Sequence, residues 1–313
     1  MHSKSVPAVA ALGSLLVATV GCQSAPPEDP RAARAEAYER VGSWPDAAAL
    51  WTEIYLAGGA RDVEAGLSAA RSSLLAGRPE EARARLVDLV GRWPQDARVL
   101  ELFGEADMAL GQTDDARTRF TAALEIDPDR PRSLARIGAI DVAAGRTVEG
   151  LAALERSVEL DPSDVHAQLE VGFAAAELGR TDRAAVAFDV ACASDLVEDD
   201  ERMEAARRLG DDARVAPWLE PVVRRDPQRT EALWRLGAAR RLGGSLGRGR
   251  KLLGRAAESD PGNVDALVRY ANALLEDGFA DDAREVVEHA GSLNLTEAES
   301  SRIEELASAL EGA

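Results

Sequence analysis

The stretch that decides the fold runs from residue 97 to 130 and reads ARVLELFGEADMALGQTDDARTRFTAALEIDPDR. Its apolar and small residues recur every three or four positions, as they do on one face of a helix. Gly111 is expected to end the first helix, because glycine tolerates the left-handed conformation of a C-terminal cap. Asp127-Pro128 is expected to halt the second, because the residue before a proline avoids helical geometry. The residues that would face each other across this helix pair are Leu100, Phe103, Gly104, Asp107, Ala116, Phe120 and Ala123.

The same pattern recurs along the chain at a fixed step. Asp-Pro pairs end at Pro128, Pro162, Pro227 and Pro261, and both the first two and the last two prolines lie 34 residues apart. Two series of glycines keep the same step: Gly104, Gly138 and Gly172, and then Gly77, Gly111, Gly145 and Gly179. Three markers with one period indicate a repeat architecture, in which each unit buries its apolar face against its neighbours.

This period and these residues resemble the tetratricopeptide repeat over about residues 28–297. The resemblance implies an all-α fold, a right-handed superhelical solenoid of about eight helix-turn-helix units. The sixth unit, near residues 199–229, is shortened and irregular, since the gap between its flanking prolines is three residues short of two units. Thr296 and Glu299 form the pattern of a capping box, so a final helix is expected within residues 296–313, covering the apolar end of the solenoid.

Residues 1–22 have the pattern of a secretory leader. An uncharged, mostly apolar run from Val6 to Val20 is too short to span a bilayer comfortably but suits the core of a signal peptide. The sequence Thr19-Val20-Gly21-Cys22 resembles the bacterial lipobox, which implies cleavage before Cys22, lipidation of that cysteine and a place in the cell envelope. Residues 23–30 would then be a flexible tether. An ordinary secretory leader or an uncleaved anchor is the alternative.

In bacterial lipoproteins an aspartate after the cysteine tends to retain the protein in the inner membrane. Gln23 stands at that position here. The resemblance therefore favours the periplasmic face of the outer membrane over the inner membrane.

Composition excludes several classes of function. A net charge of −18 disfavours general nucleic-acid binding, which relies on cationic contacts to phosphates. Only Cys22 and Cys192 are present, so a disulfide framework is not expected. No histidines or cysteines have metal-ligand spacing, and no catalytic constellation is visible. We therefore expect no enzyme, no metal and no cofactor.

In the tetratricopeptide family the second, fifth, ninth and twelfth residues of each unit line a concave groove that holds peptides. Phe173 and Trp234 would be its large anchors, the usual source of binding energy. The alternative is that the register is off by one residue and both rings are buried between helices. The candidate groove residues are Leu67, Arg71, Leu74, Met108, Arg132, Val142, His166, Leu169, Phe173, Trp234 and Arg241.

These features favour a membrane-tethered scaffold or assembly factor that binds other proteins in the envelope. A glycan-binding or enzyme-regulating envelope protein, of the polysaccharide export or synthesis type, is the alternative. Between Arg202 and Arg255 the chain has 14 basic and 6 acidic residues. These cations are either solvated helix faces or, near Trp234 and Arg241, a docking surface for an acidic partner segment or anionic lipid.

Overall fold

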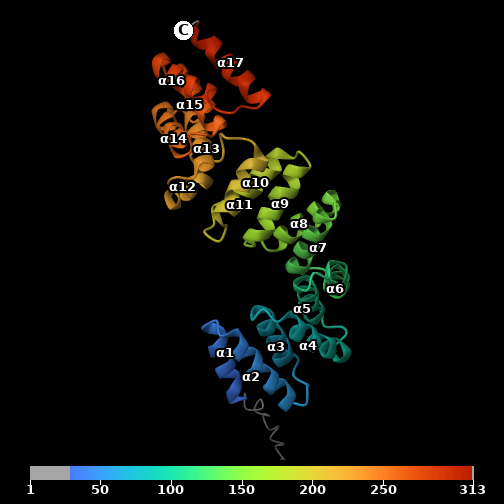
Figure 1. Cartoon of the computed structure of the whole chain (residues 1–313). Coiled ribbons are helices and arrows are strands. Elements are labelled where there is room, and N and C mark those ends of the chain that lie inside the picture. The colour runs from blue at the N-terminus through green and yellow to red at the C-terminus, as the bar shows by residue number, and fades with distance from the viewer. Residues whose placement is uncertain (1–28, 312–313) are drawn as a thin grey trace, which may run out of the picture. The chain divides into compact units, whose positions relative to one another are not determined.

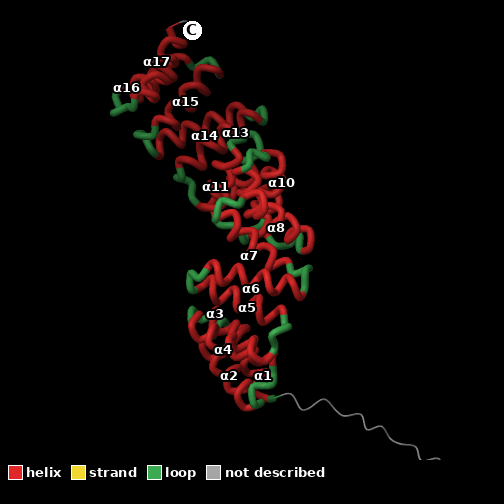
Figure 2. Tube along the Cα trace, turned by 90° about the vertical axis from the view of Figure 1, so that its right-hand side faces the viewer, coloured by secondary structure: helices red, strands yellow, loops and turns green. Residues whose placement is uncertain are grey.

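The computed structural model describes residues 29–311, which form helices joined by short turns and contain no strand (Figures 1 and 2). The chain divides into two compact units at Arg85 and Leu86. The first unit contains α1 (Pro30–Arg40), α2 (Trp44–Ala57) and α3 (Val63–Leu75), and the boundary falls within α4 (Pro79–Arg92). The helices of the second unit are α5 (Ala97–Ala109), α6 (Thr113–Ile126), α7 (Pro131–Ala143), α8 (Thr147–Leu160), α9 (Val165–Glu177), α10 (Thr181–Cys192), α11 (Asp199–Leu209), α12 (Ala216–Arg225), α13 (Thr230–Leu242), α14 (Leu246–Ser259), α15 (Val264–Glu276), α16 (Ala280–Gly291) and α17 (Glu297–Glu311).

Within the second unit each helix contacts the next one along the chain, from α5 to α17. The helices form successive pairs, each closed by a turn, with α17 left over at the end. This arrangement is that of a solenoid, and it confirms the all-α repeat fold expected from the 34-residue period.

Small residues let the two helices of a pair approach closely, as the sequence predicts for Gly104. A Cβ atom on Gly104 would stand 2.7 Å from the Phe120 ring. In the same way, a Cβ atom on Gly138 of α7 would stand 2.6 Å from Leu154 Cγ of α8. Gly111 ends its pair's first helix with φ +73°, the left-handed conformation expected there.

The irregular sixth unit consists of α11 and α12, with 11 and 10 residues, against 13 and 14 in α7 and α8. A buried arginine, Arg202, organises the connection that leads into it. Its guanidinium donates to the carbonyl oxygens of Val197 and Ser194, at 2.6 Å each, and of Cys192 at 3.3 Å. Buried carbonyls need donors, so Arg202 replaces the hydrogen bonds that a regular turn would supply.

The last helix, α17, caps the solenoid as predicted. The Thr296 N–H donates to Glu299 Oε2 at 2.8 Å, and the Glu299 N–H points back to Thr296 Oγ1 at 3.4 Å. The helix buries its apolar face against α15 and α16. The buried residues of that face are Ile303, Leu306 and Leu310.

The expected tether is shorter than residues 23–30. Pro30 is already the first residue of α1, because the Asp29 carboxylate accepts the Arg31 N–H at 2.9 Å and so caps the helix. The leader at residues 1–22, the lipidation site Cys22 and the rest of the tether lie outside the described residues. Within residues 29–311, no helix is both long and apolar enough to cross a membrane.

Candidate functional site

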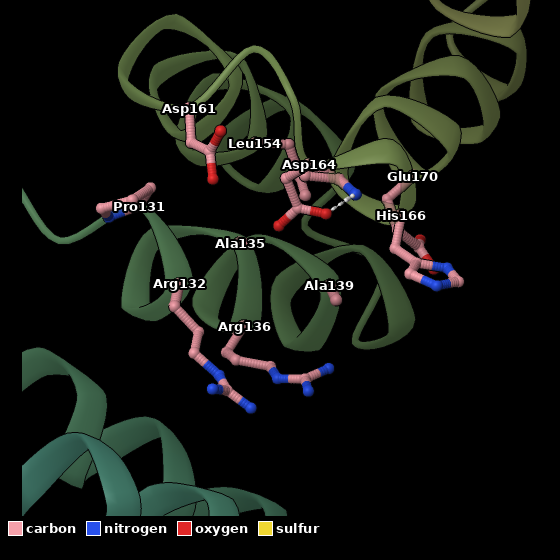
Figure 3. Close-up of a pocket in the computed structure, with 11 residues that line it drawn as sticks. Pro131, Arg132, Ala135, Arg136, Ala139, Leu154, Asp161, Asp164, His166 and Glu170 are labelled. Carbon is pink, nitrogen blue, oxygen red and sulfur yellow. Dashed lines mark hydrogen bonds between the residues drawn. The ribbon is translucent and has the colours of Figure 1, made fainter. Parts of the chain in front are cut away.

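A cleft of about 610 Å³ opens between α7 and α9, the first helices of two successive pairs (Figure 3). We call it the α7–α9 cleft. It contains two of the predicted groove residues, Arg132 and His166. Its lining residues are Pro131, Arg132, Ala135, Arg136 and Ala139 of α7, Leu154 of α8, Asp161 and Asp164 of the connecting turn, and His166, Ala167 and Glu170 of α9.

One wall of the cleft is basic. The Nε atoms of Arg132 and Arg136 both lie 2.9 Å from the same carboxylate oxygen of Glu105 on α5. The two arginine side chains remain 61% and 43% exposed. Each guanidinium has five N–H donors, so sharing one carboxylate oxygen leaves most of their donors available. This wall can therefore bind a second carboxylate.

The opposite wall carries Glu170, whose charge Arg136 across the cleft offsets only in part. Glu170 is half-buried, and among residues 29–311 its carboxylate has neither a hydrogen bond nor an ion pair. Burial raises the pKa of this carboxyl, and Glu201 raises it further, although Arg136 and His166 oppose the shift. A half-buried carboxylate without a partner is costly in the free protein, and a cation brought by a ligand would remove that cost.

The other two acids of the cleft already accept hydrogen bonds from backbone N–H groups. Asp164 accepts the Ala167 N–H at 3.0 Å and so caps α9 (Figure 3), while Asp161 accepts the N–H of Ser163 at 3.0 Å. Between the walls, Ala135 and Ala139 have only methyl side chains, which leave the cleft open. The arrangement can accept an extended segment that brings a carboxylate to α7 and a cation to α9.

Among the residues described, no cluster of histidine, cysteine, aspartate or glutamate has the geometry to hold a metal ion. The acidic run Asp199-Asp200-Glu201 starts α11 instead. Glu201 and Glu198 form a capping box there, and Asp199 and Asp200 bind Arg225 and Arg229. These acids therefore serve the helix start and its neighbours.

Two sequence models described as tetratricopeptide repeat match residues 73–137 with 243–300, and residues 137–201. Together these segments cover more than half of the chain. The chain belongs to the tetratricopeptide-repeat family. No sequence among the curated proteins matches it.

Several solved tetratricopeptide-repeat structures are similar. The APC/C hetero-tetramer Cut9–Hcn1 is 14% identical, with a TM-score of 0.46. The match covers 87% of this chain and 54% of that chain. YrrB, described as having an unusual peptide-binding site, is 15% identical with a TM-score of 0.40 over 70% of this chain and 97% of that one. A repeat protein from Parabacteroides merdae is 14% identical with a TM-score of 0.44 over 79% and 98%.

Three predicted groove residues prove to be buried, so the expectation that they are open to a partner is wrong. Leu67, Leu169 and Trp234 all occupy the fifth position of a repeat, counted from the first residue of α3, α9 and α13. Their side chains are 4%, 3% and 8% exposed. At this position a large apolar side chain packs between successive repeats, where burial stabilises it by about 25 cal/mol per Å². Trp234 is also covered by the guanidinium groups of Arg235 and Arg269, at 4.6 and 4.0 Å from the ring centre.

The other apolar candidates are only partly available. Phe173 is half-buried, with its ring edge-to-face against Phe188 at 5.3 Å. Met108 and Val142 are half-buried and pack on core clusters of the second unit. In the first unit Leu74 is half-buried and Arg71 is exposed. Whether these five residues contact a partner stays a prediction.

Arg241 does not present its charge to a groove ligand, contrary to expectation. Its guanidinium binds Asp277 at 2.9 Å and Glu276 at 2.7 Å, and its side chain is only 11% exposed. Arg240 is likewise paired with Glu220. Glu220 of the preceding helix α12 and two acids at the C-terminal end of α15 therefore neutralise these cations. The basic surface predicted around Trp234 and Arg241 is therefore absent at that position.

Two important residues of the cleft were not predicted from the sequence. Arg136 and Glu170 occupy the sixth position of successive repeats, 34 residues apart, next to the fifth position that was expected to face the groove. The sequence signal that could have identified them is a charged residue at the sixth position, directly after an alanine or a leucine at the fifth. The helices are rotated so that the sixth position faces the cleft in both α7 and α9, whereas the fifth lines it only in α7, as Ala135, and is buried in α9, as Leu169.

Proposed function

We propose that this protein is an envelope scaffold that binds an extended segment of another protein in the α7–α9 cleft. The observation that carries the proposal is the pair of unlike walls, with Arg132 and Arg136 on one side and the unpaired Glu170 on the other. Tetratricopeptide repeats serve as protein-interaction scaffolds, which supports a protein as the ligand. The partner segment would carry an acidic and a basic side chain at matching positions.

Site-specific photocrosslinking in cells that express the full chain tests this proposal. A photoreactive residue at Ala139, inside the cleft, should give a discrete adduct with a partner protein. The same residue at Val148, which is 56% exposed on α8, is the control and should give none. The Ala139 adduct should weaken when Glu170→Gln or Arg132→Gln is added. Equal adducts from both positions, or an Ala139 adduct unaffected by both substitutions, would contradict cleft binding.

We further propose that lipid on Cys22 tethers this scaffold to the membrane, at the periplasmic face of the outer membrane. The support is the apolar run that ends at Gly21-Cys22 and the glutamine that follows. Labelled palmitate should enter the wild-type chain and not the Cys22→Ser variant, and only the wild type should fractionate with membranes. Equal labelling of both chains would contradict the proposed lipid anchor, and it would leave the proposal of binding in the cleft unaffected.

A further inference from the structure

The basic run between Arg202 and Arg255 separates into paired and unpaired cations. Arg202 is buried, and nine other arginines each contact an aspartate or glutamate: Arg207, Arg208, Arg214, Arg225, Arg229, Arg235, Arg240, Arg241 and Arg250. Four cations of the run have no acidic partner anywhere in residues 29–311. They are Arg224, Arg248, Lys251 and Arg255, and all four are exposed.

These four residues lie on two helices, α12 and α14, both of which contact α13. Arg248, Lys251 and Arg255 are spaced three and four residues apart, so they occupy one face of α14. Arg255 donates to the carbonyl oxygen of Pro227 at 2.8 Å, which brings the turn after α12 against this face. Arg224 stands on the last turn of α12, three residues before Pro227. We call the face of α14 that carries Arg248, Lys251 and Arg255, together with the adjacent end of α12, the α12–α14 surface.

An apolar pocket of about 300 Å³ lies within this surface. Leu236 of α13 and Leu252 of α14 supply its apolar lining, and Arg248 and Lys251 stand at its side. Glu220 is the one acid of the lining, and Arg240 already neutralises it. Asp226 and Glu258, the acids nearest to these cations along the chain, do not line the pocket.

We infer that the α12–α14 surface docks an acidic, amphipathic segment of a partner protein, by inserting one apolar side chain between cations. This site is separate from the α7–α9 cleft and goes beyond the proposed function. Charge complementarity selects the partner, because the chain as a whole carries a net charge of −18 whereas this face is cationic and attracts carboxylates. The apolar pocket favours a peptide over a membrane, since lipid head groups would meet the cations and leave Leu236 and Leu252 unused.

The chain offers a specific chemical probe of this inference. Lys251 is the only lysine among the described residues, the other being Lys4 of the leader. A carbodiimide activates carboxylates and couples them to amines, losing water overall as the amide bond forms. A synthetic peptide in which glutamates flank one phenylalanine should therefore crosslink to the full chain at Lys251. Its glutamine analogue should not crosslink, and a glutamate peptide with alanine in place of phenylalanine should crosslink less.

Binding of the labelled peptide, followed by fluorescence anisotropy, gives the quantitative test. The double variant Arg248→Gln, Lys251→Gln should lose about tenfold in affinity at low ionic strength and should show a weaker dependence on salt. The matched control is Arg207→Gln, Arg208→Gln, which removes the same charge from arginines that Glu204 and Glu231 already neutralise. The control should bind like the wild type.

Three outcomes would overturn the inference. One is the absence of saturable peptide binding at low salt. Another is equal affinity and salt dependence in the two double variants, which would make the binding a response to net charge alone. The third is binding to vesicles of anionic phospholipid that is tighter than binding to the peptide, which would assign the surface to lipid. Glu170→Gln, in the α7–α9 cleft, should change none of these measurements.

Discussion

Gly172 of α9 lies so close to Phe188 of α10 that a Cβ atom on the glycine would stand 2.3 Å from Cε1 of the ring. Phe188 is fully buried and also meets Trp218 of α12 edge-to-face, with ring centres 5.9 Å apart. The ring cannot move aside without disturbing the junction with the sixth repeat. This contact fixes how closely the helices of the fifth repeat approach.

Gly172→Ala should therefore destabilise the protein by about 1–3 kcal/mol, the usual cost of overpacking a core. The measurement is the free energy of unfolding from urea titration of the full chain. Gly91→Ala is the control, since a Cβ atom there meets nothing within 4 Å, and it should be neutral or stabilise α4 by up to about 1 kcal/mol. A neutral Gly172→Ala would show that Phe188 has room to shift.

Arg202→Met should destabilise the connection between α10 and α11 by about 2–5 kcal/mol. The substitution keeps most of the apolar stem but removes the donors to three backbone carbonyls. Hydrogen exchange should show faster opening of α11 and α12, with α15 and α16 unchanged, because repeats contact mainly their neighbours. If Arg202→Met unfolds no more easily than the wild type, water satisfies these carbonyls and the arginine is dispensable.

Asp277 should make stability depend on pH in the acidic range. The hydrogen-bonded guanidinium of Arg241 holds the pKa of this carboxyl below its ordinary value, against the opposing effect of burial. The contribution is therefore fully present above the unfolded pKa of about 4 and is lost as pH falls through the lower folded pKa. Asp277→Asn should cost about 2 kcal/mol at pH 7, and the difference from wild type should disappear in acid.

The control for Asp277 is Asp281→Asn. Asp281 is 97% exposed and pairs with Arg284 one turn away, so its loss should change stability little at any pH. Parallel pH profiles for the two variants would mean that the Arg241–Asp277 pair contributes nothing specific.

Glu170→Gln should stabilise the free protein at neutral pH while weakening partner binding in the cleft. Burial raises the pKa of Glu170 in the folded state, so the wild type loses stability as pH rises from the unfolded pKa through the folded one. The glutamine variant has no such loss. The melting temperature of Glu170→Gln should therefore rise above that of the wild type as pH increases from the unfolded to the folded pKa of Glu170, and the difference should stay constant at higher pH. The exposed Glu125→Gln should show no such trend. A lower melting temperature for Glu170→Gln at neutral pH would contradict an unpaired, costly carboxylate.

The repeat itself could be predicted from the sequence because its signals are local. A glycine with positive φ ends a helix and an Asp-Pro pair halts one whatever surrounds them, so Gly111 and Pro128 specify their turns without tertiary help. Thr296 and Glu299 likewise define the start of α17 within four residues. A period of 34 residues repeats these signals and leaves few architectures open.

The binding surfaces depend on helix rotation and on neighbouring helices, which local patterns do not fix. The sequence placed Trp234 and Arg241 in an open groove, but Arg269, Glu276 and Asp277 from the next repeat cover or neutralise them. Conversely, Arg136 and Glu170 face one another only because α7 and α9 stack. Whether a side chain is buried, paired or free is decided by residues about 30 positions away, and that information comes only from tertiary packing.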